Sequence, residues 1–278
     1  MPPVCLFFVS TSSAVLWGAV SGSETRTRAS RSGAGLPFSP PKLVSGGLAN
    51  TQFSSMVVDS HGVPHAFFDD FTDPINVKMY MSTLQAGTWV VHHPAVAVFN
   101  PIGTSSINWG FRISGTIAPG CAIHGDTAYC AFSSNQVANG PMESGMSVYL
   151  AKVNTSTGAS SISRVNNDIF NDGKDHLFPW ATVKNDGSVY VGFYDDRNDP
   201  FNTKLEYFVA KSTDGGKTFA TQMAVSDTAF NPCVGFPGCG FFGDYDQIAA
   251  GPDDVVHAAW SDTRDGSSMQ IFTQVVTF

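Results

Sequence analysis

The chain has 278 residues and a formal net charge of −8, with 14% charged residues, 12% aromatic residues, 27 glycines and 16 prolines. This length allows one large β domain or two smaller ones. The composition suits short strands joined by many turns better than helices. Basic residues are few and scattered, apart from Arg26, Arg28 and Arg31. Because a nucleic-acid groove needs a basic stripe, we expect no nucleic-acid partner.

Residues 4–20 are apolar with polar interruptions, and Ala19-Val20-Ser21 would suit cleavage by a signal peptidase. No Lys or Arg precedes this stretch, and it is too short and too polar to predict a membrane span. Residues 1–30 are therefore interpreted as a signal peptide or a disordered N-terminal segment, and residues 31–278 as the folded domain. A signal peptide would make the protein secreted, extracellular or periplasmic.

Four segments share one pattern of small, β-branched and aromatic residues that is typical of buried strands, at 63–69, 128–134, 189–195 and 256–262. Their aligned aromatic residues are Phe67, Phe132, Phe193 and Trp260. A turn precedes each segment, and the pattern recurs about every 64 residues, which is the length of one propeller blade with long loops. We place the repeats at about 51–105, 106–170, 171–232 and 233–278.

The third repeat shows four expected strands, at 178–183, 189–194, 204–211 and 219–226, whereas the last repeat ends after a third strand at 269–276. Residues 38–45 resemble the fourth strand at 219–226. An N-terminal strand at 38–45 could therefore complete the last blade and close the ring without a free edge. Alternatively, this segment is the remnant of a lost preceding blade, and the propeller is incomplete.

The five cysteines include no C-x-x-C pair, so we expect no structural zinc site. Cys121 and Cys130 flank a predicted turn, and Cys233 and Cys239 flank a Gly/Pro-rich loop. Two short-range disulfides and buried free thiols are both open interpretations. The closeness of Cys233 and Cys239 across a sharply turning loop predicts a disulfide for that pair.

The segment from Ser212 to Phe219 fits the Asp-box pattern S-x-D-x-G-x-T-[WF]. With the repeats, residues 30–278 resemble the sialidase-like superfamily of BNR/Asp-box propellers. The resemblance implies an all-β propeller of four-stranded antiparallel blades. Sialidases have six blades, so an incomplete six-bladed propeller remains an alternative. We expect a structural role in the turn for the Asp-box residues Ser212, Asp214, Gly216, Thr218 and Phe219.

Strand direction separates the loops into two faces. Because antiparallel strands alternate, turns from strand one to two and from three to four share one face, and turns from two to three share the other with the inter-blade segments. Loops at one end of a rigid scaffold commonly carry the site. We therefore expect substrate on the face opposite the Asp box. Candidates for binding it are His176, Phe178, Trp180, Asp244, Asp246, Asp69 and Asp70.

Asp-x-Arg sequences end the second strand of two repeats, as Asp195 with Arg197 and Asp262 with Arg264. The arginines could bind the carboxylate of an acidic sugar while the aspartates serve as acid and base. Alternatively, each pair braces its own loop, which repetition from blade to blade favours. The resemblance further implies an arginine triad and a tyrosine nucleophile. Arg112, in a partial F-R-I-P motif, and Tyr245 therefore join the four residues above as catalytic candidates.

The sequence thus predicts a sialidase-like propeller that acts on glycans as an exo-glycosidase-like hydrolase. The alternative is a non-catalytic propeller that binds a glycan, another small molecule or a protein through the same face. We expect no cofactor, although the Asp-rich loops at 69–73 and 195–199 leave Ca²⁺ open as a ligand. The oligomeric state is not predicted.

Overall fold

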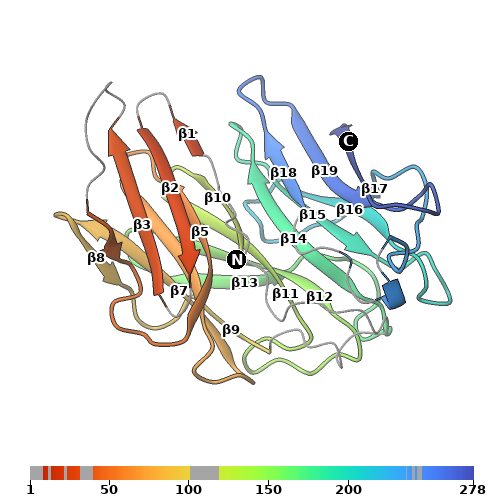
Figure 1. The fold of residues 1–278 in the computed structure, drawn as a ribbon, viewed down its shortest axis with the longest axis horizontal. Coiled ribbons are helices and arrows are strands. Elements are labelled where there is room, and N and C mark those ends of the chain that lie inside the picture. The colour runs from red at the N-terminus through yellow and green to blue at the C-terminus, as the bar shows by residue number, and fades with distance from the viewer. Residues whose placement is uncertain are drawn as a thin grey trace.

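The computed structural model describes residues 9–11, 14–21, 24–31, 40–100, 119–235, 237–239, 242 and 246–278. Across these residues the chain is built from β-strands and one short 3-10 turn at Pro237–Cys239. No helix in the described ranges is long and apolar enough to cross a membrane. The predicted all-β architecture is confirmed, and the strands form curled antiparallel sheets (Figure 1).

From β5 onward the described strands fall into four groups of consecutive antiparallel strands, which we call blades 1 to 4; a parallel bridge between β10 and β14 joins blades 2 and 3 into one eight-stranded sheet. Blade 1 contains β5 (Thr51–Val58), β6 (Pro64–Asp70), β7 (Val77–Gln85) and β8 (Thr88–Val91), and β9 (Ala97–Phe99) also pairs with β7. Blade 2 contains β10 (Gly120–His124), β11 (Thr127–Ser134), β12 (Ser147–Asn154) and β13 (Ser160–Arg164). Blade 3 contains β14 (His176–Val183), β15 (Val189–Asp195), β16 (Glu206–Ser212) and β17 (Thr221–Ala224). Blade 4 contains β18 (Gln247–Ala250), β19 (Val256–Asp262) and β20 (Gln270–Val276).

Apolar layers between neighbouring blades form the core. Tyr129, Leu150 and their neighbours in blade 2 pack against Val191 and Phe193 of blade 3. Alternate residues of blade 3, among them Tyr207, pack on the opposite side against blade 4. Side chains of a strand point alternately to its two faces, so each blade between two others must be apolar on both. This requirement explains the nearly continuous apolar strands of the sequence.

The structure corrects the alignment of the first repeat by one residue. The sequence analysis matched Phe67 to Phe193 and Trp260, but β6, β15 and β19 end at Asp70, Asp195 and Asp262, which makes Phe68 the equivalent residue. Phe67 faces blade 2, whereas Phe68 packs on the other side of the sheet with Val44. A shift of one residue exchanges the two faces of a strand, so the two adjacent phenylalanines could not be ordered from sequence.

The N-terminal segment forms a sheet of its own. Strands β1 (Val9–Thr11), β2 (Ala14–Ser21) and β3 (Glu24–Arg31) pair in order, and β4 (Lys42–Leu43) pairs with β3. Residues interpreted as a signal peptide or a disordered segment therefore include three strands, while cleavage as a signal stays a prediction. Of the expected strand at 38–45, residues 38 and 39 lie outside the described residues, and β4 does not join blade 4.

One face of blade 4 is open in the described structure. Ser261 and Ile271 form a cross-strand pair equivalent to Tyr194 and Tyr207 in blade 3. Tyr207 is fully buried because blade 4 covers it, whereas Ile271 is 74% exposed. Thr273 and Val275, on the same side of β20, are also exposed. The layer-by-layer packing that covers the other blades therefore stops at this face.

The inner strands of blades 2 and 3 come into close contact through a glycine. Gly120 of β10 forms a parallel bridge to Trp180 of β14. A Cβ on Gly120 would lie 2.5 Å from the Cα of Trp180 and 2.9 Å from the carbonyl oxygen of Pro179. Both neighbours are backbone atoms, so a side chain at this position must push the two inner strands apart.

We therefore expect Gly120→Ala to lower the free energy of unfolding by about 1–3 kcal/mol, the usual cost of overpacking a well-packed interior. A matched variant, Gly125→Asn, should cost much less, because Gly125 has a φ of 58°, which Asn tolerates, and open space around its Cβ position. Urea unfolding of both variants measures the difference. Equal stabilities would contradict the close-approach argument.

Candidate functional site

The second strand of every blade ends in the same kind of turn. A side-chain oxygen of its last residue accepts the backbone N–H of the residue two positions later, at distances of 2.7–3.0 Å. The four pairs are Asp70 with Thr72, Ser134 with Gln136, Asp195 with Arg197, and Asp262 with Arg264. These are Asx-type and Ser-type turns, which fix the direction of the chain as it leaves the strand. The shared feature is thus a loop-forming device that recurs in all four blades.

Arg197 is held entirely by its surroundings. Its Nε donates to Asp195 Oδ2 at 2.6 Å, and its guanidinium group lies 4.7 Å from the ring centre of Phe208 on the third strand of the same blade. The two terminal nitrogens donate to Asn167 Oδ1 and Gln222 Oε1. Three of the five N–H donors of this cation therefore bind protein side chains.

Arg264 repeats this arrangement in blade 4. Its Nε donates to Asp262 Oδ2 at 2.9 Å, Nη1 pairs with Asp227, and the guanidinium group lies 3.9 Å from the ring centre of Phe272. Phe208 and Phe272 lie opposite Phe193 and Trp260 on neighbouring strands. Each arginine therefore braces the loop of its own blade, which is the second of the two interpretations drawn from sequence.

His176 lies at the boundary between blades 2 and 3, 1% exposed. Its Nδ1 lies 2.6 Å from the carbonyl oxygen of Met146, and its Nε2 lies 2.9 Å from Asp168 Oδ2 and 3.4 Å from Asp195 Oδ2. Both ring nitrogens face acceptors, so both carry protons and the ring is an imidazolium. His176 therefore joins two blades through a buried ion pair and does not face a ligand cavity.

The charges of this cluster support one another. Burial acts to lower the pKa of His176, but the carboxylates of Asp195 and Asp168 outweigh it and raise that pKa to about 9. Burial likewise acts to raise the pKa of Asp168, yet its hydrogen bond to His176 and that ring's charge hold it below its ordinary range. Neighbouring Asp196, not paired with His176, has its pKa raised by burial to about 7.

This cluster predicts a pH dependence of stability. His176 has a folded pKa above its unfolded value, so its contribution is fully present below about pH 6.5 and is lost as pH rises through about 9. We expect on the order of 3 kcal/mol less stability at the alkaline end. Urea unfolding from pH 6 to 10 should show this loss in the natural protein and in the exposed-histidine control His257→Gln. A His176→Gln variant that keeps the same alkaline slope would contradict the assignment.

Trp180 and Asp246 are brought together in a cavity. The cavity has a volume of about 240 Å³ and lies beside the open face of blade 4. Its lining residues are Trp180, Asp246, Gln247, Ala259, Trp260, Ser261 and Ile271. Trp260 is stacked on Tyr207 with ring centres 5.2 Å apart and planes 5° apart, so Trp180 is the aromatic group that can face a ligand. The lining therefore combines two indoles, one carboxyl group, one amide and one hydroxyl group.

Asp246 is the polar centre of this cavity. Burial raises its pKa well above the ordinary range, with the hydroxyl of Tyr207 opposing the shift. Its Oδ2 is buried and has no hydrogen-bond partner among the described residues. A carboxyl group whose pKa is raised takes up a proton more readily and can then donate a hydrogen bond. The sequence analysis included Asp246 as a candidate because it lies in an inter-blade loop. It did not predict Tyr207 or Gln247, because their roles depend on packing.

The remaining candidates lie elsewhere. Asp69 and Asp70 are buried in blade 1, and Phe178 is buried in the core between blades 3 and 4, so none of them lines the cavity. Asp244, Tyr245 and Arg112 lie outside the described residues. Their predicted roles stay predictions.

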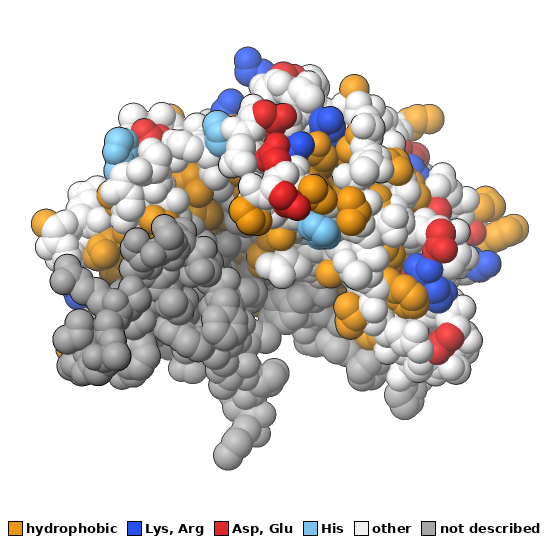
Figure 2. All heavy atoms as spheres, turned by 90° about the horizontal axis from the view of Figure 1, so that it is seen from above, with side chains coloured by type: hydrophobic (Ala, Val, Ile, Leu, Met, Phe, Trp, Pro, Cys, Tyr) orange, Lys and Arg blue, Asp and Glu red, His pale blue; other side chains and the backbone are white. Residues whose placement is uncertain are grey.

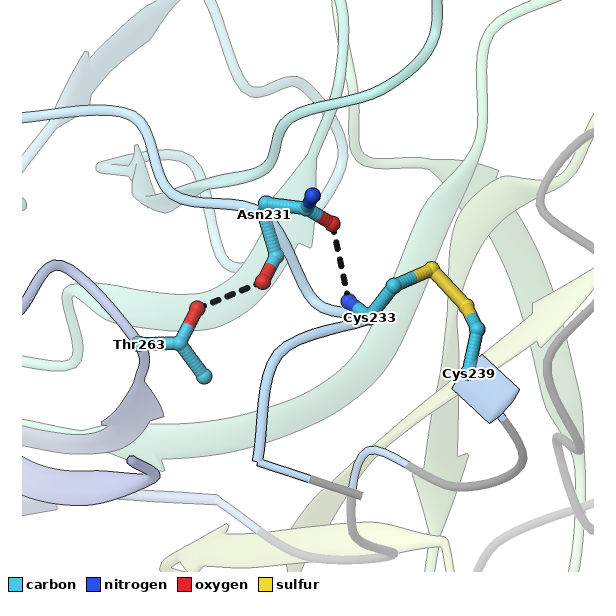
Figure 3. Close-up of a disulfide and its surroundings, with 4 residues drawn as sticks. All are labelled: Asn231, Cys233, Cys239 and Thr263. Carbon is cyan, nitrogen blue, oxygen red and sulfur yellow. Dashed lines mark hydrogen bonds between the residues drawn. A yellow bond between two sulfur atoms is a disulfide. The ribbon is translucent and has the colours of Figure 1, made fainter. Parts of the chain in front are cut away.

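Both predicted cysteine pairs are bonded in the structure. Cys121 and Cys130 face each other across β10 and β11. Cys233 and Cys239 close the loop that leads from blade 3 to blade 4, with Asn231 Oδ1 accepting the N–H of Cys233 and Thr263 donating to the carbonyl of Asn231 (Figure 3). The disulfide loop is thereby attached to the end of β19, on the side of the cavity.

The segment from Ser212 to Phe219 forms a self-contained turn between β16 and β17. Asp214 Oδ1 accepts the N–H groups of Lys217 and Thr218 at 3.0 Å, and Ser212 Oγ accepts that of Gly216 at 2.9 Å. Gly215 and Gly216 have φ values of 72° and 79°, in the left-handed region that favours glycine. Phe219 is buried between blades 2 and 3.

Removal of the Asp214 side chain should weaken folding and leave ligand affinity unchanged. Asp214→Ala leaves local N–H groups without their acceptor, and we expect a loss of about 1 kcal/mol, as for other lost turn and helix caps. The turn lies at the opposite end of the blades from the strand-two loops. A thermal melt and a ligand titration on the same sample test the expected loss of stability and the unchanged affinity. Normal melting with lost affinity would contradict the assignment of the ligand site to the face opposite this turn.

The side chains that could bind a metal ion do not cluster among the described residues. No cluster of three or more His, Cys, Asp or Glu side chains in these residues could hold a metal ion. In the loop at 195–199 suggested for calcium, the ammonium group of Lys174 binds the carbonyl oxygen of Asp199 and the side chain of Asn202. On the described part of the face seen from above, acidic and basic side chains are interspersed (Figure 2).

No family model matches the sequence, and no curated protein matches it. The fold is similar to that of an α-L-arabinanase from Penicillium chrysogenum, with a TM-score of 0.56 and 9% identity over 94% of this chain and 89% of that chain. An α-L-arabinofuranosidase from Fusarium graminearum has a TM-score of 0.55 and 9% identity, over 95% of this chain and 89% of that chain. A protein of unknown function from Dyadobacter fermentans has a TM-score of 0.54 and 12% identity, over 95% of this chain and 79% of that chain.

The two named enzymes are β-propeller glycoside hydrolases, and the chain has this propeller fold. The likeness is to propeller glycosidases in general and does not single out sialidases. Sequence identities of 9–12% support a similarity of fold only. They do not allow functional residues of those proteins to be assigned to positions in this chain.

Proposed function

We propose that this propeller is a glycan-active protein and that its sugar site is the cavity around Trp180, Asp246 and Gln247. The observation that carries the proposal is the composition of that cavity, an aromatic ring beside a buried carboxyl group and an amide. Sites for small ligands commonly combine apolar walls with a few placed polar groups. The fold supports the proposal, since the arabinanase was solved with arabinobiose and the arabinofuranosidase with an iminosugar inhibitor.

Binding and hydrolysis are separate functions of such a site. A protonated Asp246 could donate a proton to a glycosidic oxygen, which favours a hydrolase. Glycosidases of the common retaining and inverting types need a second carboxylate, and Asp246 is the only one among the lining residues. Glycan binding is therefore the primary proposal, and hydrolysis is the second candidate on the strength of the Asp246 pKa.

Sialidase activity in particular would require arginines to converge on a substrate carboxylate. Arg197 and Arg264 are each bound by an aspartate and an aromatic ring of their own blade. These contacts favour a glycan-directed function of another specificity.

A glycan array and a panel of fluorogenic glycosides, run on the same preparation, test the proposal. We expect array binding that falls in Trp180→Ala. If the site also hydrolyses, Asp246→Asn should reduce turnover by about 10²–10⁴-fold, the usual contribution of a general acid. Asp186→Asn, a carboxylate at the strand-one-to-two end of blade 3, is the matched control.

The outcomes separate the two functions. Binding without turnover assigns a carbohydrate-binding module, and turnover that depends on Asp246 assigns a hydrolase. Absence of both binding and turnover across the panels would contradict the proposal.

A further inference from the structure

The described lining residues of the cavity offer no positive charge to a ligand. Its lining residues contain one ionisable group, Asp246, and no Lys, Arg or His. Burial raises the pKa of that carboxyl group, which favours its neutral form. Gln247, at the start of β18, is exposed and supplies an uncharged amide. The described walls of the cavity therefore carry no positive charge.

Four cations at this end of blades 2 to 4 are already paired with carboxylates. Arg197 and Arg264 bind Asp195 and Asp262, and His176 is held between Asp168 and Asp195. Arg164 pairs with Asp168 at 3.1 Å. Releasing Arg264 to a ligand would leave buried Asp262 without its cation, and releasing any of the other three would remove one of the two cations of a buried carboxylate, which is costly.

The chemistry of the walls distinguishes sugars by charge. A uronic or sialic acid entering the cavity would exchange the hydration of its carboxylate for a site without a counter-charge. An uncharged sugar can instead place hydroxyl groups against Asp246 and Gln247 and an apolar face against Trp180. The volume of about 240 Å³ lies below the roughly 300–1,000 Å³ of pockets for drug-sized ligands, so one sugar unit is the suitable occupant.

From these observations we infer that the cavity takes a single uncharged sugar unit and discriminates against carboxylated sugars. The inference rests on the proposed glycan function and names the substrate class of that site. Asp246 and Gln247 are its specificity-determining residues, because they set the charge of the walls.

Pairs of oligosaccharides that differ only at the terminal unit test this inference, one ending in a neutral hexose and the other in the corresponding uronic acid. Isothermal titration of the natural protein should show at least about tenfold tighter binding of the neutral member. Gln247→Lys places an ammonium group at the cavity and should reduce that preference or reverse it. Gln274→Lys adds the same charge on exposed β20, outside the cavity lining, and should leave the preference unchanged.

Each outcome decides the inference. A neutral preference that shrinks in Gln247→Lys but not in Gln274→Lys supports it. Equal or tighter binding of the uronic acid by the natural protein overturns it while leaving the glycan site in place. A neutral preference that neither lysine variant changes shows that the site lies elsewhere and overturns the assignment to this cavity. Failure of both members of every pair to bind removes the proposed function together with the inference.

Discussion

The alternation of side chains across each β-strand is the constraint on which the rest of this structure depends. Each middle blade must bury two faces, one against the preceding blade and one against the next. Phe193 and Tyr194 are adjacent in β15, yet they belong to apolar layers on opposite sides of blade 3. A shift of one residue in register would exchange these two layers. The register of the second strand in each blade therefore has to be fixed at the end of that strand. The turn formed by Asp195, and by its counterparts in the other blades, provides that fixed end.

This requirement gives the charged residues at the strand ends a positioning role. Asp195 and Asp262 orient the loop, and their arginines cover Phe208 and Phe272 on the third strands. The same aspartate in blade 3 also faces His176, which connects the loop to blade 2. The charges are therefore used for positioning within and between blades. A ligand site on this fold has to be built from groups outside the repeated device, and Trp180 with Asp246 is such a set.

Much of the fold followed from sequence because it is repeated. The strand expected at 189–194 is observed at Val189–Asp195, and the last repeat has the three expected strands. The first repeat was placed one residue out of phase because Phe67 and Phe68 are both large and aromatic. The site was harder to predict, since residue types do not reveal their partners. Nothing in the local sequence shows that Phe208 lies under Arg197, or that Tyr207 lies beside Asp246.

The open face of blade 4 has a consequence for the energetics of the molecule. In a stack of sheets, each unit is stabilised mainly by its neighbours, and a unit with one covered face opens locally at a lower free energy than units with two. The cavity connects this less protected sheet to the inner strand of blade 3, since Gln247 belongs to β18 and Trp180 to β14. A ligand held between them would add its binding free energy to the local stability of the terminal sheet. Occupancy of the cavity and the local stability of blade 4 are thereby coupled. A bound ligand would slow amide hydrogen exchange along β18–β20.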